Sequence, residues 1–250
     1  MSDNNPHSIL ISGESGAGKS MSLYEMRDRN DVLYLNCEGG KPLPFKNKFK
    51  NKVISDPNEI LEFLELLHGE DEDGEINENP FNFIVIDTIS FMMDMFETVH
   101  VINSANSQKM WGEYSQFFKR LINESSKVDA FFIFIGHLDN WFDEDAGYFR
   151  SAVPVKGALK KNGLEAYFTT VMNVSKQPTK ILHKYPNKLL TITEEEKELG
   201  FKHVFQTRTV KATIGDRIRS PMGMWAKEEL YINNDIGPVI KRLLEYYEED

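Results

Sequence analysis

One loop of the sequence has the residue types and spacing that bind phosphate. Its eight residues fit the pattern GxxxxGK[ST]; they are Gly13, Glu14, Ser15, Gly16, Ala17, Gly18, Lys19 and Ser20. Glycines in this pattern let successive backbone N–H groups close around phosphate oxygens, and the helix that follows adds its positive N-terminal end. We therefore expect Lys19 to contact the β- and γ-phosphates of ATP and Ser20 to bind Mg²⁺.

A triphosphate site also needs a carboxylate near the metal, and Asp87 is placed to supply it. It follows the apolar run FIVI at residues 83–86, which is typical of a buried strand. The next residue is Thr88 and not a second acid. The general base must therefore come from another part of the chain.

Glu38 is the best candidate for that base. It follows the run VLYLN at residues 32–36, and the carboxyl ends of parallel strands lie along one edge of a sheet. His137 follows the apolar run at 131–135 and is expected on the same edge, close to the γ-phosphate. Two plainer alternatives stay open: Glu38 as a surface residue of a glycine-rich turn, and His137 as a histidine that is only hydrogen-bonded in place.

Alternating strands and helices must position these residues. Short apolar runs predict strands at residues 8–12, 32–36, 83–86 and 131–135. Amphipathic stretches predict helices at residues 19–29, 59–68, 111–127 and 237–247. Extended segments predict antiparallel strands at residues 168–175, 189–193 and 203–210. We therefore expect an α/β fold with a mainly parallel central sheet flanked by helices, and antiparallel strands added at its C-terminal side.

The composition suits a single domain that spans residues 1–250. The only cysteine, Cys37, excludes a disulfide framework. The N-terminal residues lack the pattern of a signal peptide, and no apolar run is long enough to cross a bilayer. We expect a cytoplasmic protein with no membrane partner.

The net charge of −10 argues against nucleic acid as a partner until its distribution is considered. Residues 53–108 contain 13 acidic side chains and no lysine or arginine, which leaves 26 acidic against 29 basic residues elsewhere. Part of this stretch, the acidic segment at 69–79, is typical of a solvated loop insertion. The remaining chain is mildly basic, so nucleic acid is not excluded.

The residues that follow the predicted strands resemble those of the RecA-type recombinase core, over roughly residues 9–225. Within that resemblance, Glu38 matches the catalytic glutamate and Asp87 the aspartate of the metal site. His137 stands where the family usually has a glutamine that couples nucleotide state to DNA. The segment GALK at 157–160 is similar to the family segment that enters the next strand. The resemblance implies a RecA-like P-loop ATPase that uses ATP and Mg²⁺.

The same resemblance places a DNA-binding loop at residues 138–156. Its candidate contact residues are Trp141, Phe142, Phe149, Arg150 and Lys156. Exposed aromatic side chains suit the stacking of single-stranded bases. The acidic residues at 143–145 oppose DNA, and the alternative is a loop that packs on itself or on a neighbouring subunit.

Arg217 resembles the family's basic residue that crosses a subunit interface to a neighbour's γ-phosphate. Such a residue stabilises the charge of the transferring phosphoryl group and makes hydrolysis depend on assembly. Lys211 and Arg219 lie close to it in sequence and are candidates for the same role. The alternative is a set of surface arginines on a hairpin.

The chain is most similar to the small phage nucleotide-binding proteins, which include the Sak-type single-strand annealing recombinases. This likeness implies single-stranded DNA as a partner, assembly into a filament or ring, a single-strand-binding or replication protein as a further partner, and the host cytoplasm as the location. Two alternatives of other classes stay open. One is a nucleotide kinase-like phosphotransferase, and the other is a motor or loader ATPase that acts on a protein partner.

Overall fold

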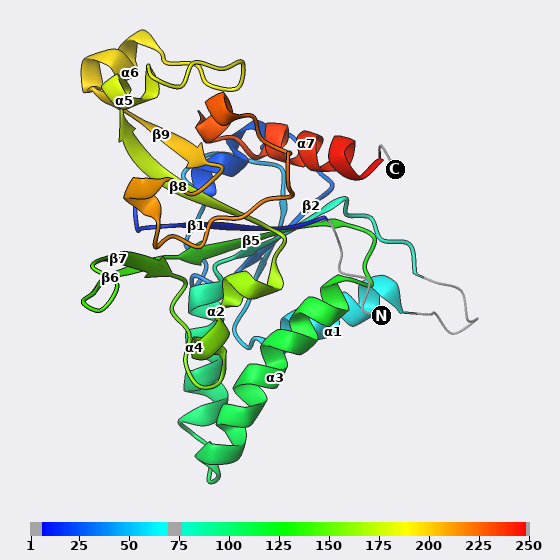
Figure 1. Ribbon diagram of the computed structural model, residues 1–250. Coiled ribbons are helices and arrows are strands. Elements are labelled where there is room, and N and C mark those ends of the chain that lie inside the picture. The colour runs from blue at the N-terminus through cyan, green and yellow to red at the C-terminus, as the bar shows by residue number, and fades with distance from the viewer. Residues whose placement is uncertain (1–6, 70–76, 249–250) are drawn as a thin grey trace.

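The computed structural model describes residues 7–69 and 77–248 and has an α/β fold built on one large sheet (Figure 1). The sheet contains eight strands in the order β10-β9-β8-β1-β5-β4-β2-β3. Their bounds are Ser8–Gly13 (β1), Val32–Asn36 (β2), Lys50–Val53 (β3), Phe83–Asp87 (β4), Phe131–His137 (β5), Thr170–Pro178 (β8), Phe201–Gln206 (β9) and Tyr231–Asn233 (β10). The six neighbouring strands β8, β1, β5, β4, β2 and β3 pair in parallel, whereas β9 pairs antiparallel with both β8 and β10. The fold class expected from the sequence is confirmed.

Two hydrophobic cores cover the two faces of the sheet, because side chains alternate along each strand. Leu10 packs in one core with helices α1, α2 and α3, whereas Ile9 and Ile11 pack in the other with η1 and α7. The bounds of these helices are Asn58–His68 (α1), Ile89–Phe96 (α2), Ser107–Ser125 (α3), Ile236–Glu248 (α7) and Ser20–Met26 (the 3₁₀ helix η1). With both faces covered, the central strands are apolar throughout, as parallel strands usually are.

Short helical turns occupy several connections. They are the π-helix η2 (Glu97–Val101), α4 (Leu159–Asn162), η3 (Leu164–Tyr167), α5 (Thr179–Leu182), α6 (Glu194–Leu199), η4 (Lys211–Thr213) and η5 (Lys227–Leu230). Among the described helices, none combines the length and the apolar character that a membrane span requires.

The register of the parallel strands brings their carboxyl ends together. Gly13 at the end of β1 pairs with His137 at the end of β5. Asp87 at the end of β4 pairs with Ile135 of β5 on one side and with Asn36 of β2 on the other. Residues that follow these four strands therefore share one edge of the sheet.

Two expected elements take a different form. The stretch 19–29, expected to be a helix, is the shorter 3₁₀ helix η1. Most of the segment 168–175, expected to be antiparallel, lies in β8, which pairs antiparallel with β9 on one side but in parallel with β1 on the other. The connection through α4 and η3 returns the chain to the far side of β1, and such a crossover allows the parallel direction.

The prediction of a strand at residues 189–193 is wrong. Leu190 and Ile192 pack against a small cluster that includes Val204 of β9. The alternation of apolar and polar residues in this segment therefore reflects tertiary packing and not pairing in a sheet. The exposed edge of β9 is occupied by β10, a strand that the sequence pattern did not reveal. Residues 189–193 instead lie beside the end of β10, where the Asn233 N–H donates to the Leu189 carbonyl.

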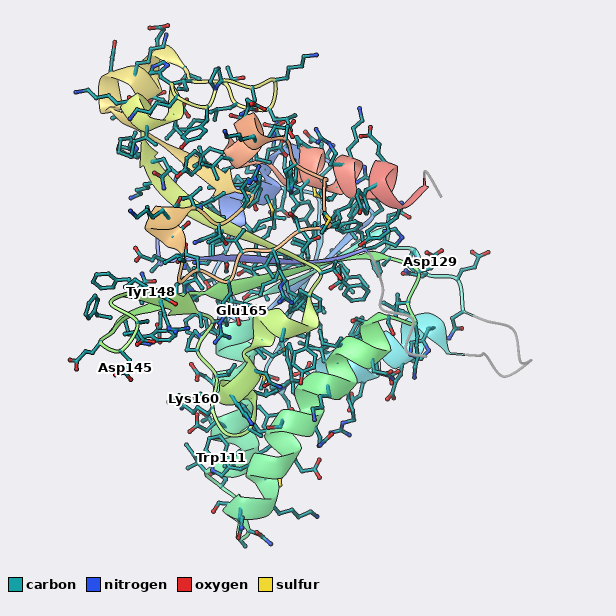
Figure 2. All side chains as sticks on the ribbon, viewed as in Figure 1. Trp111, Asp129, Asp145, Tyr148, Lys160 and Glu165 are labelled. Carbon is teal, nitrogen blue, oxygen red and sulfur yellow. The ribbon has the colours of Figure 1, made fainter. Side chains whose placement is uncertain are left out.

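The expected loop at 138–156 contains an antiparallel hairpin of β6 (Asp139–Asp143) and β7 (Tyr148–Ala152). It projects from the body of the protein, with Asp145 and Tyr148 at its far end (Figure 2). Of the acidic segment 69–79, residues 70–76 lie outside the described residues. The two flanks of that segment meet where the Asn77 N–H donates to the Gly69 carbonyl at 2.9 Å.

Candidate functional site

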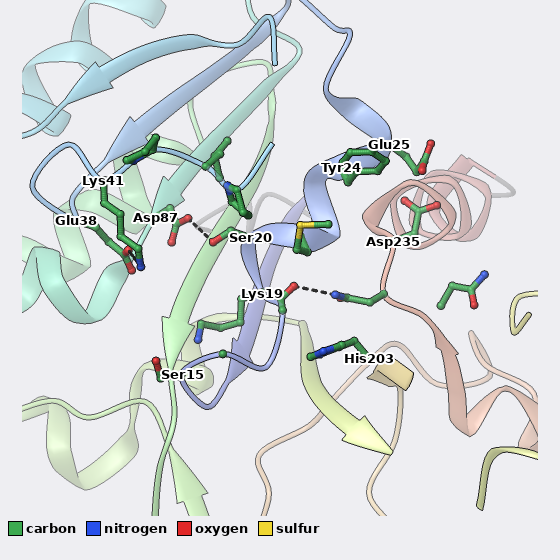
Figure 3. Close-up of a pocket in the computed structure, with 18 of the residues that line it drawn as sticks. Ser15, Lys19, Ser20, Tyr24, Glu25, Glu38, Lys41, Asp87, His203 and Asp235 are labelled. Atoms are coloured by element: carbon green, nitrogen blue, oxygen red, sulfur yellow. Dashed lines mark hydrogen bonds and ion pairs between the residues drawn. The ribbon is translucent and has the colours of Figure 1, made fainter. Parts of the chain in front are cut away.

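Eight of the expected site residues line one cavity of about 820 Å³, among them Lys19, Glu38, Asp87 and His137 (Figure 3). Lys19 reaches the cavity from the loop after β1, and His137 from the end of β5. Asp87 comes from the end of β4, and Glu38 follows β2. Strand β5 lies between β1 and β4, so His137 stands between the loop and the carboxylates.

The glycines of the loop are required by its geometry. Gly18 has φ +101°, a left-handed conformation that side chains disfavour, and a Cβ there would lie 3.0 Å from Asn234 Nδ2. A Cβ on Gly13 would lie 2.7 Å from the carbonyl oxygen of Val174, which is closer than real Cβ atoms approach. The motif is therefore held in a conformation that only glycine allows at these positions.

Lys19 is buried beneath this loop. Its Nζ donates to the carbonyls of Gly13 at 3.0 Å and Glu14 at 2.9 Å, and lies 3.1 Å from His137 Nδ1. Burial lowers the pKa of Lys19 to about 8, because the nearby carboxylates of Asp87 and Glu38 offset the loss of hydration only in part. On nucleotide binding, the ammonium group can replace these hydrogen bonds to carbonyls with hydrogen bonds to phosphate oxygens.

This lowered pKa predicts how nucleotide binding responds to pH. Phosphate favours the ammonium form, so affinity for ATP should be constant below pH about 8 and should weaken at higher pH, approaching tenfold per unit, as Lys19 loses its proton. Calorimetric titration with ATPγS between pH 6 and 10 measures this, with a Lys19→Arg variant as the control, since a guanidinium stays charged over that range. A wild-type affinity that stays flat to pH 10 would contradict the assignment.

Asp87 is held by two hydroxyl groups. Its Oδ2 accepts from Ser20 Oγ at 2.9 Å and from Tyr34 Oη at 2.7 Å, while its Oδ1 is buried without a hydrogen-bond partner among the described residues. Burial raises the pKa of Asp87, and these two hydrogen bonds act in the opposite direction. A buried carboxylate oxygen without a partner, next to a serine hydroxyl, fits the oxygen ligands that Mg²⁺ prefers.

Tyr34 was not among the residues expected from the sequence. Its hydroxyl orients Asp87 from strand β2, which is paired with β4. A tyrosine inside an otherwise apolar strand needs a hydrogen-bond partner when it is buried, and this is the signal that could have identified it.

His137 connects Lys19 with Glu38. Its Nδ1 faces the Lys19 ammonium, so this nitrogen is the acceptor and Nε2 carries the proton toward Glu38 Oε1 at 3.4 Å. Lys41 Nζ donates to Glu38 Oε2 at 3.1 Å. The hydrogen bond from His137, followed by the contact with Lys41, lowers the pKa of Glu38 to about 2, so Glu38 is ionised at neutral pH, the state in which it can accept a proton.

The β6–β7 hairpin presents aromatic side chains to solvent. Trp141, Phe142 and Phe149 are 43%, 52% and 68% exposed. The two basic residues expected beside them are paired with acids of the same chain, Arg150 with Asp143 and Lys156 with Glu97. The hairpin also contacts the loop at 13–20 directly, through a hydrogen bond from Asn140 to Glu14.

Arg217 does not line the cavity that contains Lys19. Its Nη1 donates to Glu165 Oε2 at 2.9 Å, and Glu165 is itself buried and accepts from the Val153 N–H at 2.7 Å. Arg219 donates to the carbonyls of Glu165 and Phe168. Within one chain, these arginines support the η3 region and not the cavity.

A family model described as an AAA domain matches residues 5–216. This range includes the loop at 13–20 and the residues Glu38, Asp87 and His137. No curated protein matches the chain.

Proposed function

Since this chain belongs to the AAA domain family and is therefore a P-loop ATPase of that kind, we propose that it hydrolyses Mg-ATP in a RecA-like reaction coupled to single-stranded DNA. The convergence of Lys19, Glu38, Asp87 and His137 at the carboxyl ends of adjacent strands is the observation that carries the proposal. Annealing or strand exchange, as in the small phage recombinases, is the DNA reaction that we propose.

In this proposal, Glu38 orients a water molecule and accepts its proton as the oxygen attacks the γ-phosphorus. The bond from the γ-phosphorus to the bridging oxygen breaks, so that ADP and inorganic phosphate leave. The Lys19 ammonium stabilises the negative charge that develops during the transfer. Ser20 and Asp87 would hold Mg²⁺, which supplies positive charge next to the β- and γ-phosphates.

We propose that the DNA contacts come from the β6–β7 hairpin. The exposed rings of Trp141, Phe142 and Phe149 supply stacking surface, and Arg150 and Lys156 would have to exchange their acidic partners for phosphates. The bond between Asn140 and Glu14 offers a direct route from the hairpin to the nucleotide loop.

Assembly into a filament or ring is part of the same proposal. In such an assembly Arg217 of one copy would leave Glu165 and reach the γ-phosphate of its neighbour. A single-strand-binding or replication protein would be a further partner. A kinase-like phosphotransferase has less support, because no arginine is among the described residues that line the cavity.

Hydrolysis measured with and without single-stranded DNA across a salt series tests the proposal. We expect severalfold stimulation at low salt that fades as salt rises, because phosphate contacts release counterions. A Trp141→Ala/Phe149→Ala double variant should lose most of the stimulation, and Leu199→Ala, which removes an exposed apolar side chain elsewhere, should keep it. Hydrolysis indifferent to DNA at every salt concentration would favour an ATPase that acts on a protein partner.

A further inference from the structure

Two side chains from the C-terminal strands contact the backbone of the nucleotide loop. His203 lies on β9, and its Nδ1 is within hydrogen-bond distance of the Ala17 carbonyl oxygen. Asn234 follows β10, and its Nδ2 donates to the Gly18 carbonyl oxygen at 2.8 Å. Figure 3 shows His203 directly beside the loop that carries Lys19. Both residues also line the cavity.

These contacts bear on the direction of the peptide groups in the loop. A peptide group that turns its N–H toward a phosphate turns its carbonyl oxygen away, and that oxygen then needs a donor of its own. His203 and Asn234 supply donors to two consecutive carbonyls, on Ala17 and Gly18. The following N–H groups, on Gly18 and Lys19, belong to the same two peptide units and are therefore fixed with them.

The burial of the Asn234 side-chain amide is compensated only in part. Its Oδ1 is buried without a hydrogen-bond partner among the described residues, an arrangement that disfavours folding. The backbone on either side of Asn234 is held in place, because the Asn233 N–H donates to the Leu189 carbonyl and the Asp235 N–H donates to the Asn233 carbonyl. Among the described residues, the Asn234 amide makes one hydrogen bond, to the Gly18 carbonyl, and this bond offsets part of the cost of burial.

We propose that His203 and Asn234 are positioning residues that clamp the nucleotide loop in its phosphate-binding conformation. They act through the carbonyls of Ala17 and Gly18 and not on the reacting atoms. The antiparallel strands thus do more than widen the sheet, since they fix the loop from outside the parallel core. This role rests on the proposed nucleotide site and deepens it.

The first test needs no nucleotide. Hydrogen exchange of the peptide that covers residues 13–20 is measured by mass spectrometry in wild type, Asn234→Ala and His203→Ala. We expect exchange at least about threefold faster in both variants, because the clamped conformation opens more often. Asn187→Ala is the matched control: Asn187 also donates to backbone carbonyls of the C-terminal region, on Tyr185, Glu228 and Tyr231, but does not touch the loop.

The second test measures the affinity for ATPγS, and asks whether it depends on the position of the hydrogen-bond donor at residue 203. Calorimetric titration with ATPγS and Mg²⁺ should give a Kd about fivefold weaker for Asn234→Ala and for His203→Ala, the effect of one lost hydrogen bond. His203→Asn should restore most of the affinity, because an asparagine Nδ2 occupies nearly the position of a histidine Nδ1. His203→Gln, whose amide reaches further, should not restore it. Turnover at saturating ATP should fall no more than about twofold, since a positioning role of this kind acts mainly on binding.

The results of the two tests distinguish a failure of the proposed clamp from a failure of the proposed ATP hydrolysis. Unchanged exchange of the loop in both alanine variants, or equal rescue by asparagine and glutamine at position 203, would overturn the clamp while leaving hydrolysis intact. A wild-type protein that binds ATPγS but releases no phosphate from ATP would overturn the proposed hydrolysis, and faster exchange in the variants would still support the clamp.

Discussion

Replacing Glu38 with glutamine is expected to lower ATP turnover by about 10²- to 10⁴-fold while nucleotide binding persists. The amide keeps the size of the side chain and can still contact Lys41, but it cannot accept the proton of the attacking water. The loss should therefore appear in kcat, measured as phosphate release, and not in the Kd for ATPγS.

Glu25→Gln is the matched control for this variant. Glu25 lines the same cavity, yet it lies beside Tyr24 and Asp235 and away from Asp87 and Glu38 (Figure 3). Its amide variant should keep turnover within about twofold, as expected for a group that takes no part in proton transfer. If Glu38→Gln hydrolysed ATP at the wild-type rate, the general base would have to be another residue.

The parts of the site that follow the strands could be predicted because the chemistry is local. The loop at 13–20 has a backbone that glycine alone permits at Gly13 and Gly18, and Asp87 ends a strand that is buried on both faces. A continuous apolar run that ends in a polar residue indicates both the strand and the edge at which it ends. The cavity brings these residues together as expected, with Glu38 and His137 beside them.

The remainder could not be predicted because it depends on partners remote in sequence. His203 and Asn234 contact a loop near residue 17, and nothing in their own neighbourhoods indicates this. Strand β10 has only three residues and becomes a strand by pairing with β9. The segment 189–193 has the alternation of a strand, but tertiary packing uses its apolar side chains in a different way.

The properties of the β6–β7 hairpin could also be predicted only in part. The DNA contacts that the resemblance implies require exposed aromatic side chains, and Trp141, Phe142 and Phe149 are exposed. The composition could not indicate that Arg150 and Lys156 would be neutralised by Asp143 and Glu97. Charge therefore favours DNA less than a count of basic residues in this segment suggests, and stacking has to carry more of the proposed affinity.

Lys19→Met is expected to reduce hydrolysis by at least about 10²- to 10³-fold and yet to leave the nucleotide-free protein no less stable than wild type. The first effect follows from the loss of the charge that stabilises the transferring phosphoryl group. The second follows from burial, which lowers the pKa of Lys19 to about 8. Below that pH folding buries an ammonium at a cost, and between pH about 8 and 10.5 the folded chain releases the proton and the cost declines.

Thermal unfolding at pH 7 without nucleotide and phosphate release with ATP measure the two effects in one pair of proteins. Lys41→Met is the matched control, since Lys41 lines the same cavity but is exposed, and Glu38 is its one ion-pair partner in the described part of the chain. Its loss should change turnover by no more than about fivefold. Equal turnover in wild type and Lys19→Met would show that Lys19 takes no part in the reaction. A melting temperature well below wild type would mean that the hydrogen bonds of Lys19 to Gly13 and Glu14 stabilise the fold by more than burial of the charge costs.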